Sequence, residues 1–242
     1  MTIEQTVALA ADFWERAGAP EPYPRTLDRA IVTTTPVWIV RLDGLCPDAA
    51  QHWLRRRGLT LPLTIPARRL HGCILAYCGQ GVIFVEAGLS APLDRVIVAH
   101  EFAHYLAQYE RPRLQAIRRL GAAILPLLDG HRPARTNEKL AAALSGVPLG
   151  AHVHFMERTF DPRLLRRTAQ VEREANELAC ELLAPRQDVV AAMAGAATSE
   201  TGAWETVLCE RFGLAQPWAA AYALRLRRWA RRRRSFSDLL GL

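Results

Sequence analysis

The sequence contains no apolar stretch long enough to cross a lipid bilayer. Spanning requires roughly 18–20 consecutive apolar residues, whereas the longest candidates, 30–40 and 121–128, are shorter and are interrupted by threonine or proline. Residues 1–16 also lack the basic segment followed by an apolar segment that marks a secretory signal, and their apolar positions recur at helical spacing. We therefore expect a cytoplasmic protein.

Cysteine and lysine are both scarce. The five cysteines are an odd number without close paired spacing, which argues against a disulfide framework and favours reduced thiols. Cys73 and Cys78 lack a second CxxC-type pair, so we interpret them as small buried hydrophobic residues and not as metal ligands. Lys139 is the only lysine, so arginine carries nearly all of the basic charge behind the net charge of +7. This excess is compatible with an acidic partner or a nucleic acid.

With 242 residues, half of them apolar and 23% charged, the chain can bury a substantial core. Periodicity and turn signals predict helices over 1–16, 47–57, 161–183, 201–212 and 217–234, and a helix that starts near Ser90 and stops near Pro112. They predict a strand over 30–40, interrupted at Pro36, and a β-hairpin over 72–87 with its turn at 79–81. The region 113–160 gives only short helical signals and an unassigned segment that contains His152 and His154.

The most informative segment is a histidine–glutamate motif on the helix that follows the hairpin. His100 and His104 are four residues apart and therefore lie on the same face of a helix, where two imidazoles can reach one ion. Glu101 projects from nearly the same side. Zn²⁺ suits such a site, because three protein ligands leave a fourth position for water. The pattern predicts Glu101 as the general base of a zinc hydrolase.

The alternative is that this HExxH pattern arose by chance, or that the histidines only cap or line a core. The surrounding residues are apolar, and burying two histidines and a glutamate there is costly unless they find partners or a metal. We therefore favour the metal site.

A third protein ligand is expected from the helix over 161–183. Glu172 shares one helical face with Ala175, Asn176 and Ala179, which are small or apolar and should pack inward. We therefore predict Glu172 as the ligand and Asn176 as a hydrogen-bond partner of a ligand. The alternative is that Glu172 is only a structural ion-pair partner. A second face, formed by Gln170, Glu174, Glu177 and Glu181, is predicted to be solvated.

With these segments in place, the sequence resembles the ImmA/IrrE family of metallo-endopeptidases. The resemblance is carried by GVIFVEAGLS, RVIVAHEFAHYL and VEREANELACELLAP, with weaker similarity in LCERFGLAQPWAAAYAL. It implies an α+β, zincin-like fold with a small, mostly antiparallel sheet beside the active-site helix. It also implies a strand, Val82, Ile83, Phe84 and Val85, that pairs with extended substrate. The implied substrate is a helix-turn-helix repressor or a similar regulator.

The resemblance divides the chain into three parts: an N-terminal helix and linker over 1–24, a zinc metallopeptidase domain over 25–200, and C-terminal helices with a basic tail over 201–242. Glu172 follows His104 by 68 positions (172 − 104), more than we expect for compact members, so 111–160 is interpreted as an insertion. His131, His152 and His154 within it are candidates for stabilising the transition state, although histidines in loops are often bystanders.

The arginines between Arg225 and Arg234 leave two interpretations open. They could contact DNA phosphates or an acidic partner, or they could be the solvated end of a helix, where cations are favourable. A non-catalytic regulator, with a zinc scaffold and binding through the basic tail or the insertion, is therefore the rival hypothesis. A peptidase that stays latent until the 111–160 region moves is a third. The sequence does not distinguish zinc from manganese.

Overall fold

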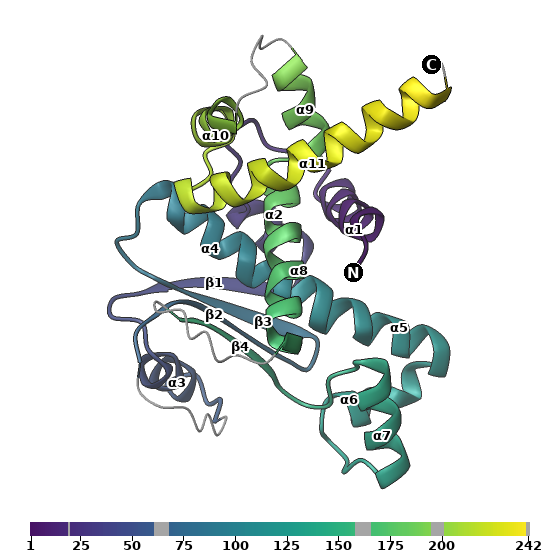
Figure 1. Cartoon of the computed structure of the whole chain (residues 1–242). Helices are drawn as coiled ribbons and strands as arrows, with labels where there is room; N and C mark the ends of the chain where they lie inside the picture. Colours follow the sequence, from purple (N-terminus) through teal and green to yellow (C-terminus); the bar gives the residue numbers. More distant parts are fainter. Residues whose placement is uncertain (19, 61–67, 158–165, 195–200, 241–242) are drawn as a thin grey trace.

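The computed structural model describes residues 1–18, 20–60, 68–157, 166–194 and 201–240. Its strands are β1 (Val37–Leu42), β2 (Leu70–Tyr77), β3 (Gln80–Glu86) and β4 (His152–Glu157). Within this part of the chain they form one sheet in the order β1-β3-β2-β4 (Figure 1). β1 is parallel to β3, and the other two pairings are antiparallel. The predicted α+β class with a small, mostly antiparallel sheet is confirmed.

Helices cover both faces of the sheet. Helix α3 (Pro47–Arg55) packs on one face over a small core that contains Leu54 and Phe84. Helices α4 (Ala91–His104) and α8 (Arg166–Leu183) lie on the other face, and α8 packs across α4 (Figure 1). This arrangement places the HExxH helix between the sheet and the helix that carries Glu172.

The N-terminal and C-terminal helices belong to the same large core. Helix α1 (Ile3–Arg16) buries Phe13 edge-on against Phe102 of α4, with ring centroids 4.9 Å apart. Helices α9 (Arg186–Ala194), α10 (Thr201–Glu210) and α11 (Gln216–Leu240) add Val189, Leu208 and Tyr222 to this core, and the turn between α10 and α11 adds Phe212. None of the described helices is both long and apolar enough to cross a membrane.

The β2–β3 hairpin is confirmed, but its turn is Cys78-Gly79, earlier than predicted. Both residues have positive φ, +50° and +80°, as a two-residue type I′ turn requires. The hydroxyl of Tyr105 donates to the carbonyl oxygen of Gly79 at 3.1 Å, and the hydroxyl of Tyr109 accepts from its N–H at 2.7 Å. The helix that continues from the HExxH motif therefore holds the turn.

β3 is an inner strand of the described sheet, so the predicted substrate strand is wrong. Val82, Ile83, Phe84 and Val85 pair with β1 on one side and with β2 on the other, which leaves no open edge for a substrate. The nearly continuous apolar run of β3 is what a strand buried on both faces requires. The outer strands are β1 and β4.

The predicted strand over 30–40 is half wrong, because α2 (Asp28–Thr34) occupies its first part. Thr33, Thr34 and Thr35 each donate a side-chain hydrogen bond to the carbonyl one turn back, at 2.6–2.8 Å. These bonds accommodate β-branched residues in a helix. Burial of Ala30 and Ile31 in the core outweighs local strand preference.

The helix after Ser90 does not stop near Pro112. α4 continues through a π-helical segment, η1 (Tyr105–Glu110), into α5 (Arg111–Leu120), and Gly121 ends this path with φ +74°. Pro112 lies in the first turn of α5, directly after the wider π-helical turns. We attribute its tolerance to this position, since proline is accepted in the first turn of an α-helix, where its missing N–H costs least.

Part of the predicted insertion over 111–160 forms a strand of the sheet. It contains α5, the short helices η2 (Ala122–Ile124) and α6 (Leu125–Leu128), α7 (Thr136–Ser145) and then β4. β4 pairs antiparallel with β2, with His154 opposite Ile74. The segment that the sequence left unassigned is therefore an outer strand of the described sheet. Asp161 and Pro162, the predicted helix start, lie outside the described residues.

The predicted solvated face of α8 is wrong at its C-terminal end. Glu181 is only 3% exposed, because α11 packs on α8 and Arg186, at the start of α9, contacts this carboxylate. Its carboxylate accepts hydrogen bonds from Arg186 Nε at 2.8 Å and from the Tyr222 hydroxyl at 3.1 Å. Burial, opposed by these partners, raises the pKa of Glu181. This glutamate is a structural link among three helices.

Candidate metal centre

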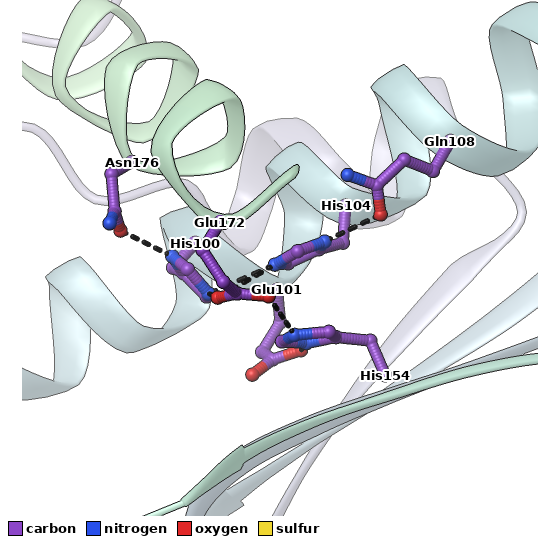
Figure 2. Close-up of polar contacts among 7 residues, drawn as sticks. All are labelled: His100, Glu101, His104, Gln108, His154, Glu172 and Asn176. Atoms are coloured by element: carbon purple, nitrogen blue, oxygen red, sulfur yellow. Dashed lines mark hydrogen bonds and ion pairs between the residues drawn. The ribbon is translucent and has the colours of Figure 1, made fainter. Parts of the chain in front are cut away.

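The HExxH motif lies on the last turns of α4, where all of its residues are buried. The Nε2 atoms of His100 and His104 are 3.0 Å apart. Helix α8 brings Glu172 to the same point, with its Oε2 3.4 Å from His100 Nε2 and 3.7 Å from His104 Nε2 (Figure 2). The structure thus brings the three predicted ligands together from two helices far apart in the chain.

These three atoms are spaced for a tetrahedral metal ion. Zinc bonds of about 2.0–2.1 Å place neighbouring ligand atoms of a tetrahedron about 3.3–3.4 Å apart, and the observed separations of 3.0, 3.4 and 3.7 Å bracket that value. Two imidazole nitrogens and one carboxylate oxygen are also a donor set that zinc accepts. The residues therefore fit a zinc ion without a large rearrangement.

The second nitrogen of each histidine is held by a side-chain amide. His100 Nδ1–H donates to Asn176 Oδ1 at 2.8 Å, and His104 Nδ1–H donates to Gln108 Oε1 at 2.6 Å (Figure 2). Such partners fix the tautomer and turn the Nε2 lone pair toward a metal. The predicted hydrogen bond of Asn176 to His100 is present, and the role of His100 as a metal ligand stays a prediction. The sequence reasoning missed Gln108, although its spacing of four residues from His104 was a usable signal.

Burial and close polar contacts set the charge states of the candidate ligands His100 and Glu172. Burial lowers the pKa of His100, which favours the neutral form that binds metal. Burial alone would raise the pKa of Glu172, but its close contacts with the imidazoles of His100, His104 and His154 hold that pKa well below its ordinary value. Glu172 is therefore an ionised carboxylate.

His154 is the site residue that the sequence did not single out from its neighbours. It enters from β4, and its Nδ1–H donates to Glu101 Oε2 at 3.1 Å while its Nε2–H donates to Glu172 Oε1 at 2.8 Å (Figure 2). Burial by itself would lower the pKa of His154, but the two carboxylates raise it to about 10. His152, a second histidine proposed in the insertion, stacks on Tyr109 and makes no hydrogen bond to the two glutamates in the described structure.

His131 lies outside the centre. Its Nε2 is 3.7 Å from Cys78 Sγ at the hairpin turn. Among the described residues, only His100, His104, His154 and Glu172 form a group of three or more such side chains that could hold a metal ion, with their ligand atoms within 4.8 Å of one another. Cys73 is buried and Cys78 is half-buried, and neither belongs to this group.

Glu101 lies between the histidines and the sheet. It is 0% exposed, and within the described residues its Oε1 has no hydrogen-bond partner. Glu101 packs against Gly72 of β2, which has no side chain; a Cβ added there would lie 3.2 Å from Glu101 Oε1. A buried carboxylate oxygen without a partner is costly in a protein built only for stability, so this atom fits a role toward a water or a substrate.

The basic C-terminus is a helix and not a tail, because α11 extends to Leu240. Its first arginine, Arg225, is paired with Glu177 at 2.5 Å. The turn before α11 packs onto α4, where Arg95 donates to the Gly213 carbonyl at 3.0 Å. Trp218 then meets the edge of His100, with ring centroids 5.5 Å apart. Helix α11 therefore lies against the candidate metal centre, and binding of DNA by its arginines stays a prediction.

Comparison with known proteins leaves the family open. No family model matches the chain, and neither a curated protein nor a solved structure matches it. The resemblance to ImmA/IrrE peptidases and the zincin-like fold therefore stay predictions. The case for a function rests on the geometry of the centre.

Proposed function

We propose that this protein is a zinc-dependent endopeptidase, with His100, His104 and Glu172 as metal ligands and Glu101 as general base. The observation that carries the proposal is Glu101, a fully buried acid beside the three ligands with one unpartnered oxygen in the described structure. A zinc site that only stabilises a fold is closed by its ligands and has no need for such an acid.

The chemistry follows from the placement of these side chains. Bound zinc would supply a Lewis acid that acidifies water and polarises a peptide carbonyl. In this proposal Glu101 accepts the proton of the attacking water and passes it to the leaving amine. Asn176 and Gln108 keep the two imidazoles oriented through the reaction. The apolar surroundings strengthen each of these electrostatic interactions.

The proposed substrate is a protein, bound as an extended strand. β4 is an outer strand of the described sheet and carries His154 at the metal centre, so an extended segment that pairs with β4 would pass close to the ligands. The sequence resemblance names a helix-turn-helix repressor or a similar regulator as the substrate class. We adopt that substrate class, with β4 in place of β3 as the strand that pairs with the substrate.

The test compares three variants that separate metal binding from catalysis. Glu101→Gln should retain one zinc per chain but lower the rate of cleavage about 10²–10⁴-fold, because it removes only the base. His104→Ala should lose zinc as well as cleavage, and the exposed Glu15→Gln should change neither. Zinc is measured by elemental analysis, and cleavage with casein and with candidate repressors, with and without chelator. Cleavage by Glu101→Gln at the wild-type rate would refute the assigned mechanism.

A second function is favoured by one observation, the fourth donor that His154 offers. If His154 completed the coordination, the site would be closed in the manner of structural zinc sites. The protein would then be a non-catalytic regulator that binds DNA or a protein through α11 or through the 111–160 region. Binding of a repressor without chelator-sensitive cleavage would support this alternative.

A further inference from the structure

We propose that His154 is a positioning residue that stays outside the coordination sphere of the metal and holds the two glutamates, Glu101 and Glu172, in their working orientations. This inference rests on the proposed function and deepens it. It also decides between the two candidate functions, because a closed site needs His154 as a fourth ligand and an open site does not.

The orientation of the rings argues against His154 as a ligand. An imidazole binds a metal through a lone pair that lies in the plane of its ring. The rings of His104 and His154 are stacked, with centroids 3.4 Å apart and planes 18° apart, so the in-plane lone pairs of the two rings run in nearly parallel planes and would not converge on one ion. The rings of His100 and His104 have centroids 4.6 Å apart and planes inclined by 71°. Their in-plane lone pairs can therefore converge on one ion.

The hydrogen bonds of His154 show what it does instead. Both of its ring nitrogens are occupied by carboxylates, Nε2 by Glu172 Oε1 and Nδ1 by Glu101 Oε2. The other oxygen of Glu172, Oε2, is the one that faces the Nε2 atoms of His100 and His104. His154 therefore holds Glu172 so that a single oxygen would face a bound metal, and it anchors Oε2 of Glu101, whose Oε1 has no hydrogen-bond partner among the described residues.

The sheet makes this placement rigid. His154 pairs with Ile74 of β2, and its neighbours Val153 and Phe155 pack into the core on the opposite face of the sheet. Because successive side chains of a strand point to opposite faces, His154 is directed at α4. Its imidazole is 16% exposed. A residue held in this way can fix the orientation of two carboxylates more strictly than a histidine on a loop.

Cobalt(II) in place of zinc provides the first test, which is independent of cleavage. In water, proton NMR of the cobalt protein should show two strongly shifted, exchangeable imidazole N–H signals, from His100 and His104. His154→Ala should keep both signals and one cobalt per chain, whereas His100→Ala, which removes a ligand, should lose the cobalt and with it both signals. Three such signals in the wild-type protein, one of them lost in His154→Ala, would overturn the proposal whatever the peptidase assay shows.

The second readout separates a positioning role from a merely structural one. Without His154, Glu172 Oε1 is free to approach the metal, so the coordination number should rise and the intense visible absorption of four-coordinate cobalt should weaken. His152→Ala, on the same strand and the same face, is the matched control and should leave the spectrum unchanged. In the zinc protein, His154→Ala should lower kcat roughly 10–100-fold with KM little changed. An unchanged cobalt spectrum in His154→Ala would contradict the role assigned to His154.

Discussion

Replacing Gly72 with alanine tests how Glu101 is positioned. Gly72 lies on β2 directly beneath the HExxH helix. A Cβ at this residue would lie 2.6 Å from Ile97 Cγ2, 3.1 Å from Glu101 Cγ and 3.2 Å from Glu101 Oε1. Ile97 is β-branched and fully buried, so it has little freedom to move aside. We expect α4 and Glu101 to be displaced from the strand together.

The expected magnitudes follow from this overlap. Adding a methyl group to a well-packed core costs about 1–3 kcal/mol of unfolding free energy. For a chain of this size that corresponds to a fall in Tm of about 2–12 °C. A displacement of about 1 Å at a catalytic group can lower the rate about 10²-fold. The loss of activity in Gly72→Ala should therefore exceed what the loss of stability explains, while one zinc per chain is retained.

The control is a second glycine of the same hairpin. A Cβ at Gly81 would lie 3.2 Å from Tyr105 and Val37 side-chain atoms, away from Glu101. Gly81→Ala should therefore lower Tm without a comparable loss of kcat. Scanning calorimetry and initial rates on casein, measured well below both transitions, compare the two variants. Equal activity of the folded proteins would show that Gly72 does not set the position of Glu101.

Three further predictions concern the supports of the centre. Asn176→Ala and Gln108→Ala should each weaken zinc affinity about 10–100-fold, measured by competition with a chelator of known affinity; wild-type affinity in both would mean that these amides do not orient the imidazoles. Phe13→Ala should lower the unfolding free energy by about 3–5 kcal/mol, because Phe13 is fully buried, and a urea titration that shows a loss under about 1 kcal/mol would place α1 outside the cooperative core. Tyr222→Phe removes the hydroxyl that donates to Glu181 and should cost about 0.5–1.5 kcal/mol in the same titration; a stabilised variant would contradict this assignment.

The predictable parts of the fold were those with local signals. The hairpin was predicted within two residues, because two apolar strands flank a turn with a glycine that adopts positive φ. The stretch 30–40 was mispredicted over its first half, because its β-branched residues favour a strand, whereas packing of Ala30 and Ile31 against the core selects α2. The order of the strands had no local signal, and that order made β3 an inner strand.

The candidate metal centre likewise has residues that local sequence spacing predicted and features that it could not predict. Spacing on single helices was enough to predict His100, Glu101 and His104, and the apolar stripe of α8 was enough to prefer Glu172 and Asn176. For these residues the helical repeat alone fixes which side chains share a face. The same reasoning failed at the end of α8, where the packing of α11 and the contact with Arg186 decide what is buried.

The sequence alone determined the donor types and the two helices that present them, because neighbours on one helix are set by the chain itself. Only the tertiary structure decided that β4 joins β2 and so carries His154 between the two glutamates. Pairing between distant strands depends on how the whole sheet is assembled, and no periodicity within 111–160 reports it. The placement of His154, on which the proposal of an open metal site rests, therefore comes from the sheet, while the donor groups of His100, His104 and Glu172 come from the helices.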